Sequence, residues 1–152
     1  MLPELMQKVA KILCNSKKLK NYIEDCCLPP VRIQIGFNIE DRIDNGVPTI
    51  FIFQGNGQIN PFTHAFSSEL HIGYALYKNT ITEHEDGYTI TDCFLHSEKI
   101  REICEMELIN HMTIFQGNFS ISSIFNDPVF AELLNSYTSI IFARPFYCEE
   151  DY

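Results

Sequence analysis

The chain has five histidines and six cysteines, the residue types best suited to acid–base, nucleophilic or metal chemistry. Cys93 and His96 lie three residues apart and come nearest to a nucleophile–base pair. A reactive thiolate needs a positive, partly exposed environment, and the sequence has neither an oxyanion-hole motif nor a Gly-x-Ser-x-Gly elbow. We therefore predict no catalytic residue, and keep a small thiol- or histidine-dependent enzyme centred on this pair as an alternative hypothesis.

The histidines and acidic residues do not have the spacing of a metal site. His64 and His71 are separated by six residues, which matches no metal-binding motif. The acidic stretch Glu83–Asp86 lacks the oxygen-ligand spacing of a calcium loop, and we interpret it as a solvated hairpin tip. His71 follows Glu69 on a predicted strand, and we interpret it as a surface or packing residue. We predict no bound metal and no cofactor.

The pentapeptide IFQGN occurs twice, at Ile52–Asn56 and at Ile114–Asn118. The first copy continues as QGNGQ, but a phosphate-binding loop needs a third glycine or a lysine in front of a helix. The two copies are followed by different residues, GQINPFT and FSISSIF. We interpret both copies as places where a buried strand leaves the sheet through a glycine of positive φ, and not as a duplicated ligand-binding loop.

The formal net charge of −9 argues against a protein that binds nucleic acid, because phosphate contacts require lysine and arginine. Basic residues cluster once, at Lys17, Lys18 and Lys20, which we interpret as a solvated helix face. Cys26 and Cys27 are adjacent, and no two cysteines form a C-x-x-C pair. We expect neither a signal peptide nor a membrane span, and we expect reduced cysteines in a chain folded in a cytoplasm.

Helical periodicity predicts three helices. An amphipathic helix at the N-terminus has its apolar residues at Leu2, Leu5, Met6, Val9, Ile12 and Leu13. Asn15–Ser16 begins a second, short helix, which Pro29–Pro30 ends. Ser97 is the predicted N-cap of a central helix, and only Glu107 interrupts the apolar face of Ile100, Ile103, Cys104 and Leu108. Arg101 and Glu105 have the spacing of a helical ion pair, worth a few tenths of a kcal/mol.

Alternating and continuous apolar runs predict the strands. Residues 31–37 alternate between apolar and polar side chains, which predicts a half-buried strand. Residues 49–53 are apolar throughout and predict a central strand covered on both faces. Asn45–Gly46 predicts a turn between these two strands. Residues 54–66 are interpreted as a loop. The following strand places Leu70, Ile72, Tyr74 and Leu76 on one face. After a hairpin at residues 80–91 and the central helix, further strands are predicted at 113–125 and 137–146, with a short helix from 126 to 134 between them. The chain, residues 1–152, is thus predicted to be one α+β domain, with a mainly antiparallel sheet packed by the N-terminal and central helices.

The strand SSELHIGYALYK, together with its surroundings, resembles the tail terminator (tail completion) proteins of long-tailed bacteriophages such as lambda. The matching order is an N-terminal helix, a VPTIFIF strand, a glycine-containing loop and the SELHIGYAL strand, then an amphipathic helix ending near INHM and a closing TSIIFARPF strand. The resemblance extends from about Leu2 to Phe146. The chain departs from the family in its longer hairpin, TITEHEDGYTIT, and in its six cysteines.

This resemblance implies a non-enzymatic structural protein of a phage or prophage. Such proteins form a hexameric ring on the tail tube, stop tail polymerisation and present the surface that docks the filled head. The implied partners are further copies of this chain, the tail tube protein and a head-completion protein, while DNA passes through the channel without specific binding. The implied location is the virion tail, assembled in a bacterial cytoplasm. Another head–tail connector or a tail-tube subunit is the alternative.

Ring or tube contacts are expected from residues 38–45, 54–66 and 83–87, because loops and hairpin tips can supply the two complementary faces of a closed ring. Phe62 and Phe66 are the predicted aromatic anchors. The full set of predicted contact residues is Arg42, Gln54, Asn56, Gln58, Phe62, Phe66, Glu83, Glu85 and Asp86.

Overall fold

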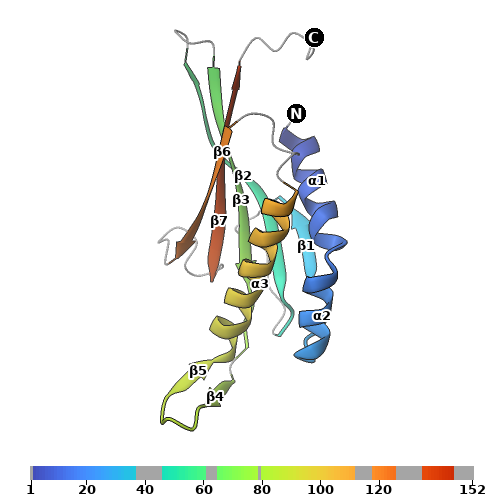
Figure 1. Cartoon of the computed structure of the whole chain (residues 1–152), viewed down its shortest axis with the longest axis vertical. Coiled ribbons are helices and arrows are strands. Elements are labelled where there is room, and N and C mark those ends of the chain that lie inside the picture. Colours follow the sequence, from blue (N-terminus) through green and yellow to red (C-terminus); the bar gives the residue numbers. More distant parts are fainter. Residues whose placement is uncertain are drawn as a thin grey trace.

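The structure, a computed structural model, describes residues 2–36, 46–60, 65–78, 80–111, 118–125 and 135–145. It has three helices and a five-stranded sheet, with a separate two-stranded hairpin (Figure 1). In chain order the elements are α1 (Leu2–Cys14), α2 (Lys17–Asp25), β1 (Arg32–Ile35), β2 (Thr49–Asn60), β3 (Ala65–Ala75), β4 (Ile81–Glu83), β5 (Thr89–Thr91), α3 (Asp92–Asn110), β6 (Asn118–Phe125) and β7 (Ser136–Pro145). The predicted α+β domain is confirmed.

The strand order of the main sheet is β1-β2-β3-β7-β6. β2, β3, β7 and β6 pair antiparallel, whereas β1 pairs parallel to β2, with Arg32 opposite Thr49 and Ile35 opposite Ile52. The sheet is therefore mainly antiparallel, as predicted. Gly46 lies in a turn with φ +81°, but this turn does not join a hairpin, because the strands on either side of it are parallel.

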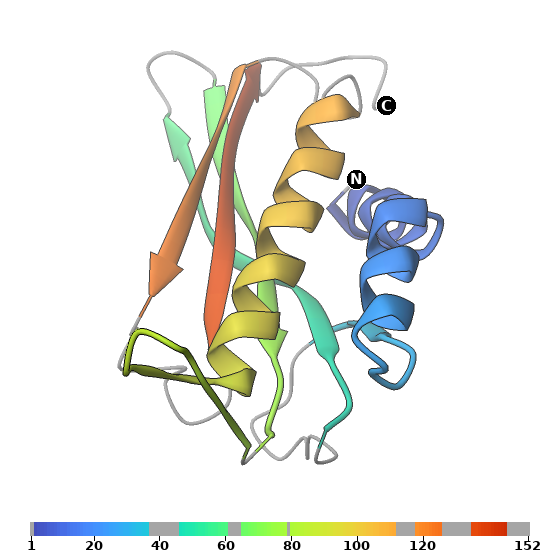
Figure 2. The same ribbon diagram turned by 60° about the horizontal axis from the view of Figure 1, so that its bottom comes forward.

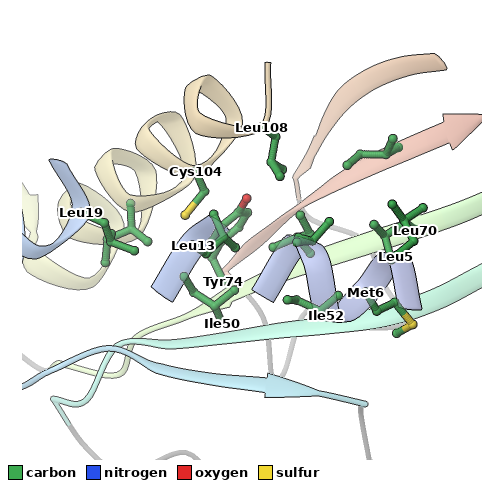
Figure 3. Packing of buried hydrophobic residues seen from close by; sticks show 14 of the residues in the cluster. Leu5, Met6, Leu13, Leu19, Ile50, Ile52, Leu70, Tyr74, Cys104 and Leu108 are labelled. Atoms are coloured by element: carbon green, nitrogen blue, oxygen red, sulfur yellow. The ribbon is translucent and has the colours of Figure 1, made fainter. Parts of the chain in front are cut away.

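All three helices cover one face of the sheet, with α1 over β1 and β2, and α3 over β3 and β7 (Figures 1 and 2). Between these layers lies an apolar core to which α1 contributes Val9 and Leu13, and α3 contributes Cys104 and Leu108 (Figure 3). The sheet side of this core consists of Ile50, Ile52, Leu70, Ile72, Tyr74 and Ile140. The predicted apolar faces are thus confirmed for most of their residues, whereas Ile12 of α1 is only half-buried and lies outside this core.

The continuous apolar run in β2 is buried on both faces, as predicted. Ile50 and Ile52 face the helices, and the alternate residues Phe51 and Phe53 are also buried. β1 is less regular, because Ile33 packs against the core whereas Ile35, at the end of that strand, is 44% exposed.

The helix ends differ from two of the predictions. Ser16 caps α2 by accepting a hydrogen bond from the Leu19 amide (3.2 Å), which confirms the predicted restart. That helix ends at Asp25, four residues before the first proline, because the chain turns at Cys27 with φ 54°. Pro29–Pro30 therefore does not end α2, contrary to the sequence prediction.

Ser97 is not the N-cap of the central helix. α3 begins at Asp92, and Thr91 occupies the cap position with an extended backbone. The Ser97 side chain is buried within the helix and donates a hydrogen bond to the Phe94 carbonyl oxygen (3.2 Å). The helix therefore begins directly after the hairpin, and its N-cap lies six residues before the predicted one.

The predicted loop at residues 54–66 is wrong over most of its length. β2 continues through a register shift between Gln54 and Gly57 and ends at Asn60, and β3 begins at Ala65. A bulge absorbs the extra residues, so that the strand continues where its composition resembles a loop. The predicted strand at 113–125 is confirmed for Asn118–Phe125, and the predicted helix at 126–134 lies outside the described residues.

Candidate interaction surface

The predicted contact residues that the structure describes lie toward opposite ends of the longest axis of the molecule (Figure 1). Gln54 is exposed in β2, and Asn56, Gln58 and Phe66 lie on β2 and β3 in the part of the ladder that leads to one end. The exposed residues Glu83, Glu85 and Asp86 lie on the β4–β5 hairpin at the other end. Arg42 and Phe62, like the segment 38–45, lie outside the described residues. Among the described residues, the structure therefore forms two separate groups, with Gln58 and Phe66 on neighbouring paired strands and the three acidic residues together on the hairpin.

At one end, three strands extend beyond the helices. Residues 57–60 of β2 pair with residues 65–68 of β3, which in turn pair with residues 142–145 of β7. Figure 1 shows these strand ends reaching past the ends of α1 and α3. None of the helices in the described residues covers these strand ends (Figure 1), so they are a candidate site of contact with another protein.

At the other end, the β4–β5 hairpin extends beyond the body of the molecule (Figure 1). Ile81 pairs with Thr91, and Gly87 takes a positive φ of 96° at the turn, as expected for a tight hairpin. The His84 and Tyr88 rings stack with centroids 4.3 Å apart and planes 9° apart. The predicted hairpin and its tip are thus confirmed.

Asp92, the first residue of α3, fixes the base of this hairpin. Its carboxylate accepts hydrogen bonds from the hydroxyls of Thr80 and Thr82, the second at 2.8 Å, and its amide donates to the Thr80 carbonyl oxygen at 3.0 Å. The two hydroxyl donors hold the pKa of Asp92 below its usual value. The hairpin is therefore attached to α3 through three hydrogen bonds.

Exposed apolar side chains accompany the acidic tip. Ile81 is 57% exposed, Tyr88 49% and Phe94, in the first turn of α3, 59%. Large apolar side chains next to charged ones are typical of protein contact surfaces, where aromatic residues contribute most of the binding energy. The acidic residues of the tip were predicted from the sequence but these three apolar side chains were not, although Ile81 and Tyr88 lie within the same predicted hairpin.

Cys93 and His96, the alternative enzymatic pair, both lie in the first two turns of α3 and are half-buried. His96 Nδ1 lies 2.8 Å from the Tyr22 hydroxyl of α2, and the two rings meet edge to face with centroids 5.9 Å apart. Burial lowers the pKa of His96, with a further contribution from the nearby Lys78. The hydrogen bond between His96 and Tyr22 therefore links α3 to α2.

A buried polar network connects α3 to the sheet, and sequence reasoning missed it. Glu105 Oε1 accepts hydrogen bonds from Arg101 Nη1 (2.9 Å), Ser123 Oγ (2.7 Å) and Thr138 Oγ1 (2.9 Å). The Tyr74 hydroxyl lies 2.8 Å from Thr138 Oγ1, and Arg101 Nη2 donates to Glu98 (2.7 Å). The predicted helical ion pair of Arg101 and Glu105 is therefore confirmed, and its two side chains are only 10% and 17% exposed.

Gly55, the glycine of the first IFQGN copy, does not have a positive φ, which contradicts the sequence interpretation. It lies at the bulge of β2, against the imidazole of His71, where a Cβ atom would overlap the ring. His71 is buried, stacks on Phe53 (5.3 Å between centroids) and meets Tyr137 edge to face (5.1 Å). The packing interpretation of His71 agrees with these contacts. The glycine of the second copy lies outside the described residues.

No three histidine, cysteine, aspartate or glutamate side chains in the described ranges are grouped so that they could hold a metal ion. Within the same ranges, no helix is long and apolar enough to cross a membrane. In comparisons with known proteins, no family model matches the chain, and no curated protein matches it. The two projecting ends are therefore the features of the described structure that bear most directly on function.

Proposed function

We propose that this chain is a structural subunit of a phage or prophage tail, which assembles into a ring on the tail tube, stops tail polymerisation and provides the surface that docks the head. The observation that carries the proposal is the placement of two projections, the three-stranded extension and the β4–β5 hairpin, at opposite ends of the long axis (Figure 1). A ring subunit must contact its neighbours in the ring as well as the tube and the head, and it therefore requires separate contact surfaces of this kind. The tail-terminator resemblance of the sequence agrees with this arrangement.

Ring formation also agrees with the shape and charge of the subunit. A cyclic ring uses two different, complementary surfaces of each subunit, which must close at a fixed rotation. The net charge of −9 leaves a surface past which DNA can slide, because a negative channel does not retain phosphates. The partners in this proposal are further copies of the chain, the tail tube protein and a head-completion protein. The proposed role is non-enzymatic.

Electron microscopy and light scattering of the purified chain, alone and mixed with tail tubes, test the proposal. We expect closed rings of about six subunits at tube ends, and tubes that stop growing once the rings are bound. Long filaments of the chain itself would indicate a tail-tube subunit instead. Tubes that carry no rings and continue to grow would contradict the proposal.

The double variant Phe62→Ser and Phe66→Ser tests the contribution of the β2–β3 end. We expect weaker ring formation or weaker tube binding, because buried aromatic residues dominate the energies of protein interfaces. Thermal unfolding of the variant is the control, since an unchanged midpoint shows that the subunit still folds. A folded variant that caps tubes like the wild type would remove this end of the molecule from the proposed interface.

A further inference from the structure

An open apolar cleft of about 250 Å³ lies between the end of α1, one side of α2 and the segment that leads into β1. Its volume suits one or two large side chains and is too small for a whole secondary-structure element. The walls are mainly apolar, and two charged side chains of α2 complete them. The lining residues are Leu13, Cys14, Leu19, Lys20, Ile23, Glu24, Leu28, Pro30, Val31 and Ile33.

The charge beside this cleft changes along α2, because Glu24 lines the cleft near the end of the helix whereas basic residues lie at its start. Lys20 lines the cleft, and Lys17 and Lys18 are exposed in the same first turn of α2. In the part of the chain that the structure describes, none of these three lysines forms an ion pair with a carboxylate. The cleft therefore combines an apolar interior with an excess of positive charge beside the first turn of α2, which suits an acidic partner that carries an exposed apolar side chain.

The β4–β5 hairpin has this composition. Glu83, Glu85 and Asp86 are exposed at its tip, and Tyr88 presents a ring that is about half exposed. The stacking of Tyr88 on His84 and the hydrogen bonds at Asp92 hold the hairpin in one conformation before any contact forms. Little conformational entropy would then be lost when the hairpin docks.

The cleft and the hairpin occupy opposite sides of one subunit. In Figures 1 and 2 the hairpin lies at the left of the molecule and α2 at the right, both toward the lower end in Figure 1. A ring built from head-to-tail contacts needs its two complementary surfaces on opposite sides of each subunit. This placement allows the hairpin of one copy to reach the cleft of the next copy around the ring.

We infer that the β4–β5 hairpin of one copy docks on the α2 cleft of the neighbouring copy, with the Tyr88 ring in the cleft and the acidic tip against Lys17, Lys18 and Lys20. The inference deepens the proposed function by naming the contact that closes the ring, and it rests on that function. The occupant is a second copy of this chain because both the charges and the positions of the two surfaces are complementary within one sequence.

Charge reversal on each surface tests the contact. The hairpin variant is Glu83→Lys with Glu85→Lys, and the cleft variant is Lys17→Glu with Lys20→Glu. Each variant alone places like charges opposite one another, and we expect half-assembly to need at least about tenfold more protein than the wild type. Acidic residues in the first turn of a helix are favourable, so the cleft variant should fold normally.

Mixing the two variants separates a broken contact from a misfolded subunit. In the mixture, the lysines of one variant's hairpin meet the glutamates of the other variant's cleft, and the remaining contact keeps its native charges. We expect rings to reappear only in the mixture, with the two variants alternating around the ring. Two matched controls, Glu4→Lys with Glu102→Lys and Lys8→Glu with Lys99→Glu, change exposed charges outside the two surfaces and should assemble like the wild type.

The outcomes distinguish this inference from the proposed function. Rings from the wild type and from both reversed variants alone would overturn the hairpin–cleft contact and leave the ring function standing. A mixture that fails to assemble, from variants whose circular dichroism and melting match the wild type, would also overturn the contact. Absence of any ring or tube cap from the wild type would overturn the proposed function, and the contact with it. Substitution of Tyr88 tests the apolar part of the contact. At high salt the attraction between charges is screened and the apolar contact remains, so a Tyr88→Ser variant should assemble more weakly than the wild type under these conditions.

Discussion

Gly55 of β2 lies directly against the imidazole of His71 on β3, with no space for a side chain between them. A Cβ atom at Gly55 would overlap the His71 ring and lie 2.8 Å from Glu69 Cβ. The bulge between Gln54 and Gly57 brings the backbone this close to its neighbour. The first IFQGN copy thus contains a glycine because of close packing, and the backbone conformation at that residue does not require one.

Gly55→Ala should therefore destabilise the chain. The added methyl group forces His71 away from its contacts with Phe53 and Tyr137, and overpacking of this kind costs about 1–3 kcal/mol. The measurement is the free energy of unfolding in urea. As a control, Gly55→Ala is repeated in a His71→Ala background, where the ring is gone and the added cost should be smaller. Equal costs in the two backgrounds would show that His71 is not the obstacle.

The buried network around Glu105 supplies a second prediction. Glu105→Ala removes the acceptor of three hydrogen bonds and leaves Arg101, Ser123 and Thr138 without it in a largely buried site. We expect a loss of about 2–3 kcal/mol in the free energy of unfolding, because Arg101 retains its ion pair with Glu98.

Glu102→Ala on the same helix is the matched control. This glutamate is 55% exposed and pairs with an equally exposed lysine at 3.6 Å, so its loss should change stability by no more than about 0.5 kcal/mol. Equal effects of the two substitutions would mean that the Glu105 network behaves as an ordinary surface ion pair.

Two partners in this network could not be predicted from the sequence. Helical spacing identifies Arg101 and Glu105 as a pair, but Ser123 and Thr138 come from β6 and β7, which are placed beside α3 only by the topology of the sheet. Local periodicity contains no information about such distant partners. For the same reason it could not predict that β1 and β2 pair parallel to each other.

Elements with one strong period were predicted well, and those with mixed signals were not. The apolar faces of α1, α3 and β3 follow from spacing alone. By contrast, the QGNGQINP stretch has the composition of a loop, yet a bulge allows β2 to continue to Asn60. Of the candidate surface, the acidic tip was predicted from its turn residues, but the complementary cleft on α2 depends on tertiary packing and has no sequence signature.

Alkaline pH should destabilise the fold through Tyr74. Burial raises the pKa of Tyr74 well above 10, because its phenolate would lie in an apolar core. The folded state therefore holds this proton more tightly than the unfolded state. The stability that protonated Tyr74 contributes is fully present below about pH 10, which is the pKa of tyrosine in the unfolded chain, and it is lost as pH rises further. Burial raises the pKa of the Cys104 thiol in the same direction.

Urea unfolding midpoints of the wild type and of Tyr74→Phe between pH 8 and 11 measure this effect. At neutral pH the variant should lose about 1 kcal/mol, because it no longer bonds to Thr138. Above pH 10 its stability should fall less steeply than that of the wild type. Parallel curves would show that Tyr74 does not contribute to alkaline unfolding.

Acidic pH should weaken the contact between α2 and α3 through His96. Burial lowers the pKa of His96 in the folded state, so the unfolded chain binds this proton more readily. The stability that neutral His96 contributes is present above about pH 6.5, which is the pKa of histidine in the unfolded chain, and it is lost as pH falls below that value. His96→Gln cannot take up the proton, so between pH 7.5 and 5 its melting temperature should fall less than that of the wild type. If both fall equally, other groups cause the acid sensitivity, and the 2.8 Å contact between His96 Nδ1 and the Tyr22 hydroxyl is not linked to it.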